Sequence, residues 1–307
     1  MQRKTPYWRS LTFCLCIFVT GNIFAQTASD SINYPLRKKI VIGGNAVAYS
    51  ATMFGLYHLW YKGYPLSSFH FFNDNQEWNQ MDKVGHAFSC YYEGVVGIKM
   101  MEYAGFTHKQ ASIYGGAYGF FIQSGVEIFD GFSEGWGASV GDIAANTFGS
   151  GLAISQSLLW NEQRVWMKYS YTPSNYAKLR PNVLGSNLPE RILKDYNAQT
   201  YWLSANINSF ASDSKWPSWL NIALGYSADG MVGGHDNIFE SNGVTYDYSN
   251  IIRGRQFYLS PDIDLTKIKT KKKFVRTLLI MANSLKVPLP TLEYHTEDGF
   301  KGHWIKF

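Results

Sequence analysis

Four long apolar stretches in the first half of the chain constrain its fold more than any other feature. Each approaches the ~20 residues that an α-helix needs to cross a bilayer, and their i, i+4 apolar spacing favours helices over strands. They lie at residues 40–61, 85–105, 109–130 and 137–160. Thr107 and Ser139 precede the third and fourth stretches and are suitable N-caps. The sequence therefore predicts an antiparallel four-helix array over residues 39–162.

Small side chains recur along these stretches at helical spacing, which lets helix backbones approach closely, as they do in membrane-embedded bundles. The two stripes are Gly141, Ala145, Gly149 and Ala153, and Ser112, Gly116 and Gly119. Charged residues such as Glu93, Lys99 and Asp142 argue against four simple spans, because buried charge is costly in hydrocarbon. We favour helices that are inserted in or lie on a membrane, with a soluble periplasmic bundle as the alternative.

The character of the sequence changes after Trp160. Residues 161–198 are polar and rich in proline, and a short helix is expected at 189–196. Alternating patterns then predict strands, and a basic run leads into a further helix. The predicted strands are 219–226, 255–265, 291–295 and 302–307, and the helix is 274–286. The predicted class is α+β, in which residues 163–307 form a loop-rich region and a small antiparallel sheet docked on the helices.

The first 25 residues have the features of a secretory signal peptide. A basic region ends at Arg9 and an apolar run ends at Ala25, after which we expect cleavage. The alternative is an uncleaved anchor, although the run is short for a membrane span. Residues 26–38 are polar and are predicted to form a tether. Cleavage would leave Cys90 as the only cysteine, which excludes a disulfide framework and a cysteine zinc site.

Composition and charge indicate the class of partner. Aromatic and charged residues each make up 17% of the chain, a balance typical of envelope and membrane-associated proteins. The net charge is +5, but Arg3, Lys4 and Arg9 belong to the leader, so the rest carries only +2. So small an excess predicts no nucleic-acid partner.

Polar residues interrupt the apolar stretches at one-turn spacing, so they share helix faces. Asp82 and His86 are four residues apart, as are Asp142 and Asn146. Antiparallel packing would bring these faces together with the acidic end of the third stretch. The predicted cluster contains Asp82, Lys83, His86, Glu127, Asp130, Asp142 and Asn146.

Three interpretations of this cluster stay open. It is a hydrogen-bonded network that holds the helices in register, a site for a polar ligand or lipid headgroup, or a catalytic site. In the catalytic interpretation His86 is the general base and Glu127 or Asp142 is its partner. A histidine with two carboxylates suits a divalent metal, but the spacing matches no specific metal motif. We therefore predict neither a metal nor a cofactor.

The same residues suggest a family. The pattern D-K-x-x-H, then E-x-x-D, then D-x-x-x-N-x-x-G runs through residues 80–152. It comprises Asp82, Lys83, His86, Glu127, Asp130, Asp142, Asn146 and Gly149. It resembles the YfiM-like predicted periplasmic or outer-membrane lipoproteins, a domain family of unknown function, and more weakly the VanZ-like membrane proteins. The resemblance implies a location and a helical fold more than an activity.

These observations predict an exported cell-envelope protein of the outer membrane or periplasm. Its expected function is non-enzymatic, the binding or organisation of a membrane lipid or cell-wall component. The alternative is an envelope-lipid hydrolase or transferase that uses the His/carboxylate cluster. Whether the protein is an enzyme is left open.

Overall fold

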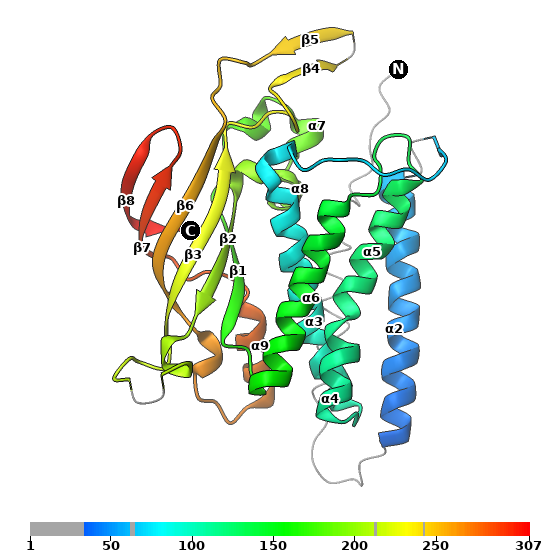
Figure 1. The fold of residues 1–307 in the computed structure, drawn as a ribbon, viewed down its shortest axis with the longest axis vertical. Coiled ribbons are helices and arrows are strands. Elements are labelled where there is room, and N and C mark those ends of the chain that lie inside the picture. The colour runs from blue at the N-terminus through cyan, green and yellow to red at the C-terminus, as the bar shows by residue number, and fades with distance from the viewer. Residues whose placement is uncertain (1–33, 62–64, 212–213, 242) are drawn as a thin grey trace. The chain divides into compact units, whose positions relative to one another are not determined.

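The computed structural model describes residues 34–61, 65–211, 214–241 and 243–307 (Figure 1). The predicted signal peptide lies outside these residues, so its cleavage stays a prediction. The chain divides into two compact units. The helical unit contains residues 89–161 and the segment that ends at Asp74, and the sheet unit contains residues 75–88 and 162–307.

Helices form at each of the four apolar stretches. Their bounds are α2 (Tyr34–Leu56), α3 (Met81–Tyr103), α4 (His108–Gln110), α5 (Tyr118–Gly131) and α6 (Val140–Trp160). Both predicted N-caps are confirmed, because Thr107 forms a capping box with Gln110 and the Ser139 hydroxyl accepts the amide of Asp142. Within the described residues, no helix is both long enough and apolar enough to cross a membrane.

The third stretch is not one helix, so the predicted four-helix array is not confirmed. A π-helical turn at Ala111–Gly115 separates α4 from α5. Here the backbone lies against α3: a Cβ added to Gly94 would lie 2.8 Å from the carbonyl oxygen of Gly116. The same added Cβ would lie 3.2 Å from the Cβ of Ala153, one of the predicted small stripe. Close backbone packing, which only small residues allow, is therefore a property of this unit.

The sheet unit is built on six antiparallel strands in the order β1-β2-β3-β6-β7-β8. Their bounds are β1 (Val165–Tyr171), β2 (Gln199–Ala205), β3 (Leu220–Asp229), β6 (Gly254–Ile263), β7 (Leu289–His295) and β8 (Gly299–Lys306). A separate hairpin pairs β4 (Ile238–Ser241) with β5 (Val244–Asp247), and the helices are α7 (Pro181–Leu184), α8 (Leu188–Lys194) and α9 (Lys273–Ala282). The four predicted strands correspond to β3, β6, β7 and β8. The sheet is larger than predicted, because β1 forms in the region expected to be loop and β2 was not identified.

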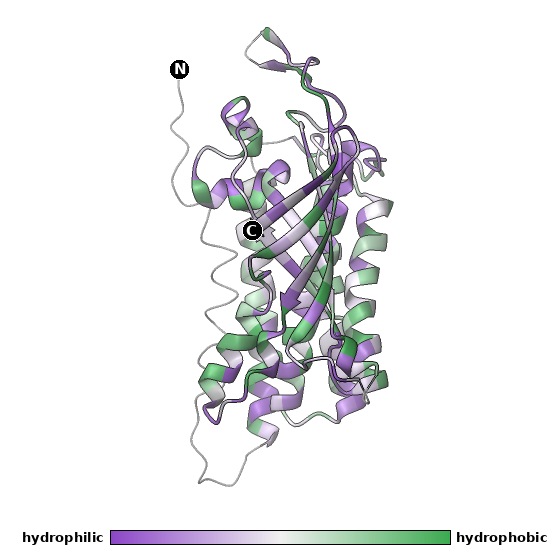
Figure 2. Ribbon diagram, turned by 90° about the vertical axis from the view of Figure 1, so that its left-hand side faces the viewer, coloured by the Kyte–Doolittle hydropathy of each residue, from purple (hydrophilic) through white to green (hydrophobic). Residues whose placement is uncertain are grey.

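Polar and apolar residues are mixed along the strands (Figure 2). The two faces of the sheet carry different side chains. One face carries a row of aromatic residues in register across all six strands, and the first turns of α3 cover part of it through Met81 and Phe88. The row is Tyr169, Tyr201, Tyr226, Phe257, Tyr294 and Phe300. The other face buries polar side chains, including Lys168 and Asp262.

Candidate functional site

Ser139, the N-cap of α6, organises a group of carboxylates in the helical unit. Its backbone N–H donates to Glu127 Oε2 at 2.9 Å, and its hydroxyl donates to Asp74 Oδ1 at 2.6 Å. The same hydroxyl accepts the amide of Asp142 at 3.1 Å. One capping residue thus binds the carboxylates of Glu127 and Asp74 and caps the helical turn that carries Asp142.

The carboxylates lie close to one another. An oxygen of Glu127 and one of Asp142 are within 4.8 Å, and the same limit holds for Asp74 and Asp142. Glu127 is 3% exposed and Asp142 is 5% exposed. Buried negative charges at this separation repel each other, although the partial positive charge at the α6 N-terminus favours them. Such a group of oxygen atoms has the chemistry to hold a cation.

A hydrogen bond between Cys90 and Asn146 links α3 to α6, one helical turn after Asp142. The Sγ of Cys90 donates to Asn146 Oδ1 at 3.3 Å, and both side chains are fully buried. Burial raises the pKa of the Cys90 thiol, and the charge of Glu93 raises it further. Both effects disfavour the thiolate, the form in which a cysteine acts as a nucleophile.

Asp82, Lys83 and His86 lie in the first two turns of α3. Lys83 Nζ pairs with Asp82 Oδ2 at 2.9 Å, and both side chains are largely buried. These turns group with the sheet unit, where burial and, secondarily, the charge of Asp82 raise the pKa of Tyr201. Glu127, Asp142 and Asn146 lie in the helical unit, so the seven-residue cluster stays a prediction.

Asp130, predicted as part of the cluster, has Tyr61 as one hydrogen-bond partner. It accepts the hydroxyl of Tyr61 at 2.7 Å, and among the described residues it is not part of the closely spaced groups of carboxylates. Burial, followed by the charge of Asp130, raises the pKa of Tyr61.

Sequence reasoning missed Asp74 and identified Ser139 only as a cap. Asp74 lies in a loop, so helical periodicity gave no signal for it. Glu93 was seen but not placed in the cluster. Its Oε1 accepts Gln123 Nε2 at 3.1 Å, and burial raises its pKa to about 8 against the opposing effect of that hydrogen bond.

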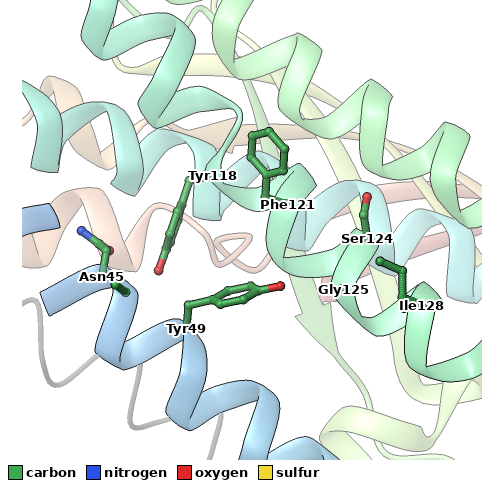
Figure 3. Close-up of a pocket in the computed structure, with 8 residues that line it drawn as sticks. Asn45, Tyr49, Tyr118, Phe121, Ser124, Gly125 and Ile128 are labelled. Atoms are coloured by element: carbon green, nitrogen blue, oxygen red, sulfur yellow. The ribbon is translucent and has the colours of Figure 1, made fainter. Parts of the chain in front are cut away.

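A pocket of about 450 Å³ lies between α2 and α5 (Figure 3). Tyr118 projects from α5 toward α2, and Tyr49 projects from α2 toward Gly125 of α5. The lining is Asn45, Ala46, Tyr49, Tyr118, Phe121, Ser124, Gly125 and Ile128. It is mainly apolar, with hydroxyl and amide groups that a ligand can reach.

Residues 70–158 match the model of a family described as predicted periplasmic lipoprotein (DUF2279). The match includes the carboxylates gathered by Ser139, whereas α2 and the sheet lie outside it. No curated protein and no solved structure matches the chain. The comparisons give no support to the YfiM-like or VanZ-like parts of the resemblance. Over this region the chain is similar to predicted periplasmic lipoproteins, which supports a cell-envelope, periplasmic protein of uncharacterised activity.

Proposed function

We propose that the chain is a non-enzymatic cell-envelope protein that binds the apolar part of an envelope lipid in the pocket between α2 and α5. The similarity to predicted periplasmic lipoproteins supports the compartment in which such a ligand occurs. The outer membrane as an alternative location belongs to the same proposal.

The observation that carries this proposal is the pairing of exposed apolar side chains with a concave surface. Phe121 and Ile128 are exposed large apolar residues of α5, and both line the pocket. An acyl chain there would remove their surface from water at roughly 25 cal/mol per Å² of apolar area. The volume lies within the roughly 300–1,000 Å³ of ordinary ligand sites. Tyr49 and Tyr118 supply hydroxyls for the polar end of the ligand.

A pocket-filling variant tests this proposal. Ala46 is exposed and lines the pocket, so Ala46→Trp fills it from the α2 side with little risk to folding. Its neighbour Val47 is exposed and does not line the pocket, so Val47→Trp is the matched control. With the fluorescent fatty acid cis-parinaric acid as probe, we expect at least roughly ten-fold weaker binding by Ala46→Trp and unchanged binding by the control. Equal binding by both variants would contradict the proposal.

A second candidate function uses the carboxylates at Ser139. Cys90 contacts Asn146, and Gly94 faces Ala153, so α3 and α6 run in the same direction. We propose that Glu127 and Asp142 supply oxygen ligands for a divalent cation. In an envelope-lipid hydrolase or transferase, His86 would serve as the general base.

Metal titration separates these possibilities. Zn²⁺ or Mn²⁺, each added alone, should raise the melting temperature in a concentration-dependent way if the site binds it. Asp142→Asn should lose this response and Asp130→Asn should keep it, since Asp130 bonds to Tyr61. A metal response that survives in Asp142→Asn would exclude the site. Phospholipid hydrolysis that is lost in His86→Gln would select the enzymatic alternative.

A further inference from the structure

We propose that α9 and the basic loop before it form a docking surface for an anionic lipid bilayer. The surface, called here the α9 segment, comprises residues 265–286. It contains seven basic residues and no acidic residue. It belongs to the sheet unit (Figure 1) and is independent of the α2–α5 pocket and of the Ser139 carboxylates.

Only part of this positive charge is used inside the protein. Lys286 is buried, with its Nζ 3.7 Å from Asp262 Oδ1 and bonded to the carbonyl oxygens of Pro261 and Val287. Lys267 pairs with Glu162 at 3.3 Å. The remaining cations include four exposed residues: Lys269, Lys271, Lys272 and Arg276. In the part of the chain that the structure describes, no carboxylate forms an ion pair with these four.

The outer face of α9 is apolar. Phe274 is 61% exposed and Leu278, one turn later, is 46% exposed. The opposite side holds the helix in place: Asn283 at its C-cap is fully buried and accepts the amide of Leu265 at 2.9 Å. The C-terminal end of the helix is therefore held by Asn283, and Phe274 and Leu278 present an apolar stripe to solvent.

This combination fits a bilayer surface better than other anionic partners. An interfacial helix buries its apolar stripe at the level of the acyl chains and keeps Lys and Arg among the headgroups. Phe274 and Leu278 would be covered by acyl chains, and the exposed lysines of the loop before α9 would meet anionic phosphates. A nucleic acid or a polyphosphate would use the cations but leave the apolar stripe in water. The geometry and the charge together point to anionic lipid.

Vesicle co-sedimentation of the full chain tests this proposal. Phosphatidylglycerol–phosphatidylcholine vesicles are compared with vesicles of phosphatidylcholine alone. The charge variant is Lys269→Gln with Lys271→Gln and Lys272→Gln. Its matched control is Lys109→Gln with Lys178→Gln and Lys215→Gln, three exposed lysines elsewhere with the same change in net charge. The apolar variant is Phe274→Ser with Leu278→Ser, and its control is Leu188→Ser with Ile238→Ser.

We expect the charge variant to bind anionic vesicles roughly 100-fold more weakly, because each lysine near the surface contributes about a five-fold change. The apolar variant should also bind weakly, and both controls should bind like the unaltered protein. Equal binding to both vesicle types, or equal loss in the lysine control, would overturn the proposal. So would a charge variant that loses polyphosphate binding while the apolar variant keeps vesicle binding. Ala46→Trp should leave vesicle binding unchanged. A failure of the docking proposal is therefore distinguishable from a failure of the pocket proposal.

Discussion

In the sheet unit, the buried carboxylate of Asp262 lies between two lysines, with Lys168 Nζ at 2.7 Å and Lys286 Nζ at 3.7 Å. In the helical unit, the buried carboxylates of Glu127 and Asp142 lie within 4.8 Å of each other. The first arrangement pairs opposite charges, and the second gathers like charges around a helix N-cap. Both groups of side chains are buried, so they differ in the charges gathered in each and not in their exposure to water.

The sheet network is closed. Ser204 Oγ donates to Asp262 Oδ2 at 2.6 Å, and Lys168 also donates to the carbonyl oxygen of Ile263 at 2.8 Å. Burial lowers the pKa of Lys286 to about 8, although Asp262 opposes this shift. A network in which cations, carboxylate and carbonyls satisfy one another is explained by structure alone. A group of carboxylates is different, because a proton or a cation relieves its repulsion.

The largest expected effect comes from removing one cation from the network around Asp262. Lys168→Met leaves Asp262 without its nearer cation in a fully buried site. Removing one partner of a buried ion pair costs about 3–5 kcal/mol of the free energy of unfolding. Urea unfolding followed by circular dichroism measures it. Lys178→Met, at an exposed lysine, is the control and should change stability by less than about 0.5 kcal/mol. Similar values for the two variants would show that the network is not structural.

A smaller effect is expected where the helical unit depends on backbone contact. An added Cβ at Gly97 would lie 2.9 Å from the carbonyl carbon of Gly115, where nothing flexible can give way. Gly97→Ala should cost about 1–3 kcal/mol through overpacking. Gly151→Ala is the control, because no atom lies within 4 Å of its added Cβ, and it should stabilise the helix by about 0.5–1 kcal/mol. If Gly97→Ala melts at the same temperature as the control, the close packing is absent in solution.

The positions of helices and strands were predictable where the local sequence pattern alone determines the element. The length of the apolar stretch and the capping residue Ser139 placed α6 within a few residues of its bounds. The alternation of polar and apolar residues placed β3 and β6. β1 was missed because residues 161–198 were interpreted together as a polar, proline-rich loop, although Met167, Tyr169 and Tyr171 alternate with Lys168 and Ser170 in its sequence. The break after α4 was missed because it depends on contact with α3, which no local pattern encodes.

The candidate site was predictable only as a set of helix faces. Spacing placed Glu127 and Asp142 on the faces of apolar helices, and both side chains are buried. Helical spacing could not predict the hydrogen bond from Tyr61 to Asp130, because that contact joins residues 69 positions apart. Asp74 lies outside any periodic element, so its bond to Ser139 required the folded chain.

A third prediction concerns Glu93, a buried carboxyl group that avoids a buried charge by keeping its proton. Burial raises the pKa of Glu93 to about 8, so the folded protein holds this proton up to about that pH. The unfolded chain releases it above about pH 4.3. The contribution to stability is therefore complete below about pH 4.3 and is lost as pH rises through about 8, with a slope of up to about 1.4 kcal/mol per pH unit.

Urea unfolding between about pH 5 and about pH 8 measures this slope. Glu93→Gln should flatten it, because glutamine cannot ionise. Glu134→Gln, at an exposed residue, should leave the slope of the unaltered protein in place. Identical pH profiles for Glu93→Gln and the unaltered protein would mean that Glu93 is ionised in the folded state.

The smallest effect on stability is expected at the carboxylates themselves. Glu127→Gln keeps an oxygen that can accept the Ser139 amide, now bonded to Glu127 Oε2 at 2.9 Å, and removes one of two like charges. Loss of repulsion offsets the loss of the charged hydrogen bond, so the free energy of unfolding should change by less than about 1 kcal/mol in either direction. Lys168→Met, which also removes one buried charge, should cost several times more. A cost of about 3 kcal/mol or more for Glu127→Gln would show that Glu127 is matched to a cation as Asp262 is. The two units would then share one arrangement of buried charge, and the carboxylates at Ser139 would be structural.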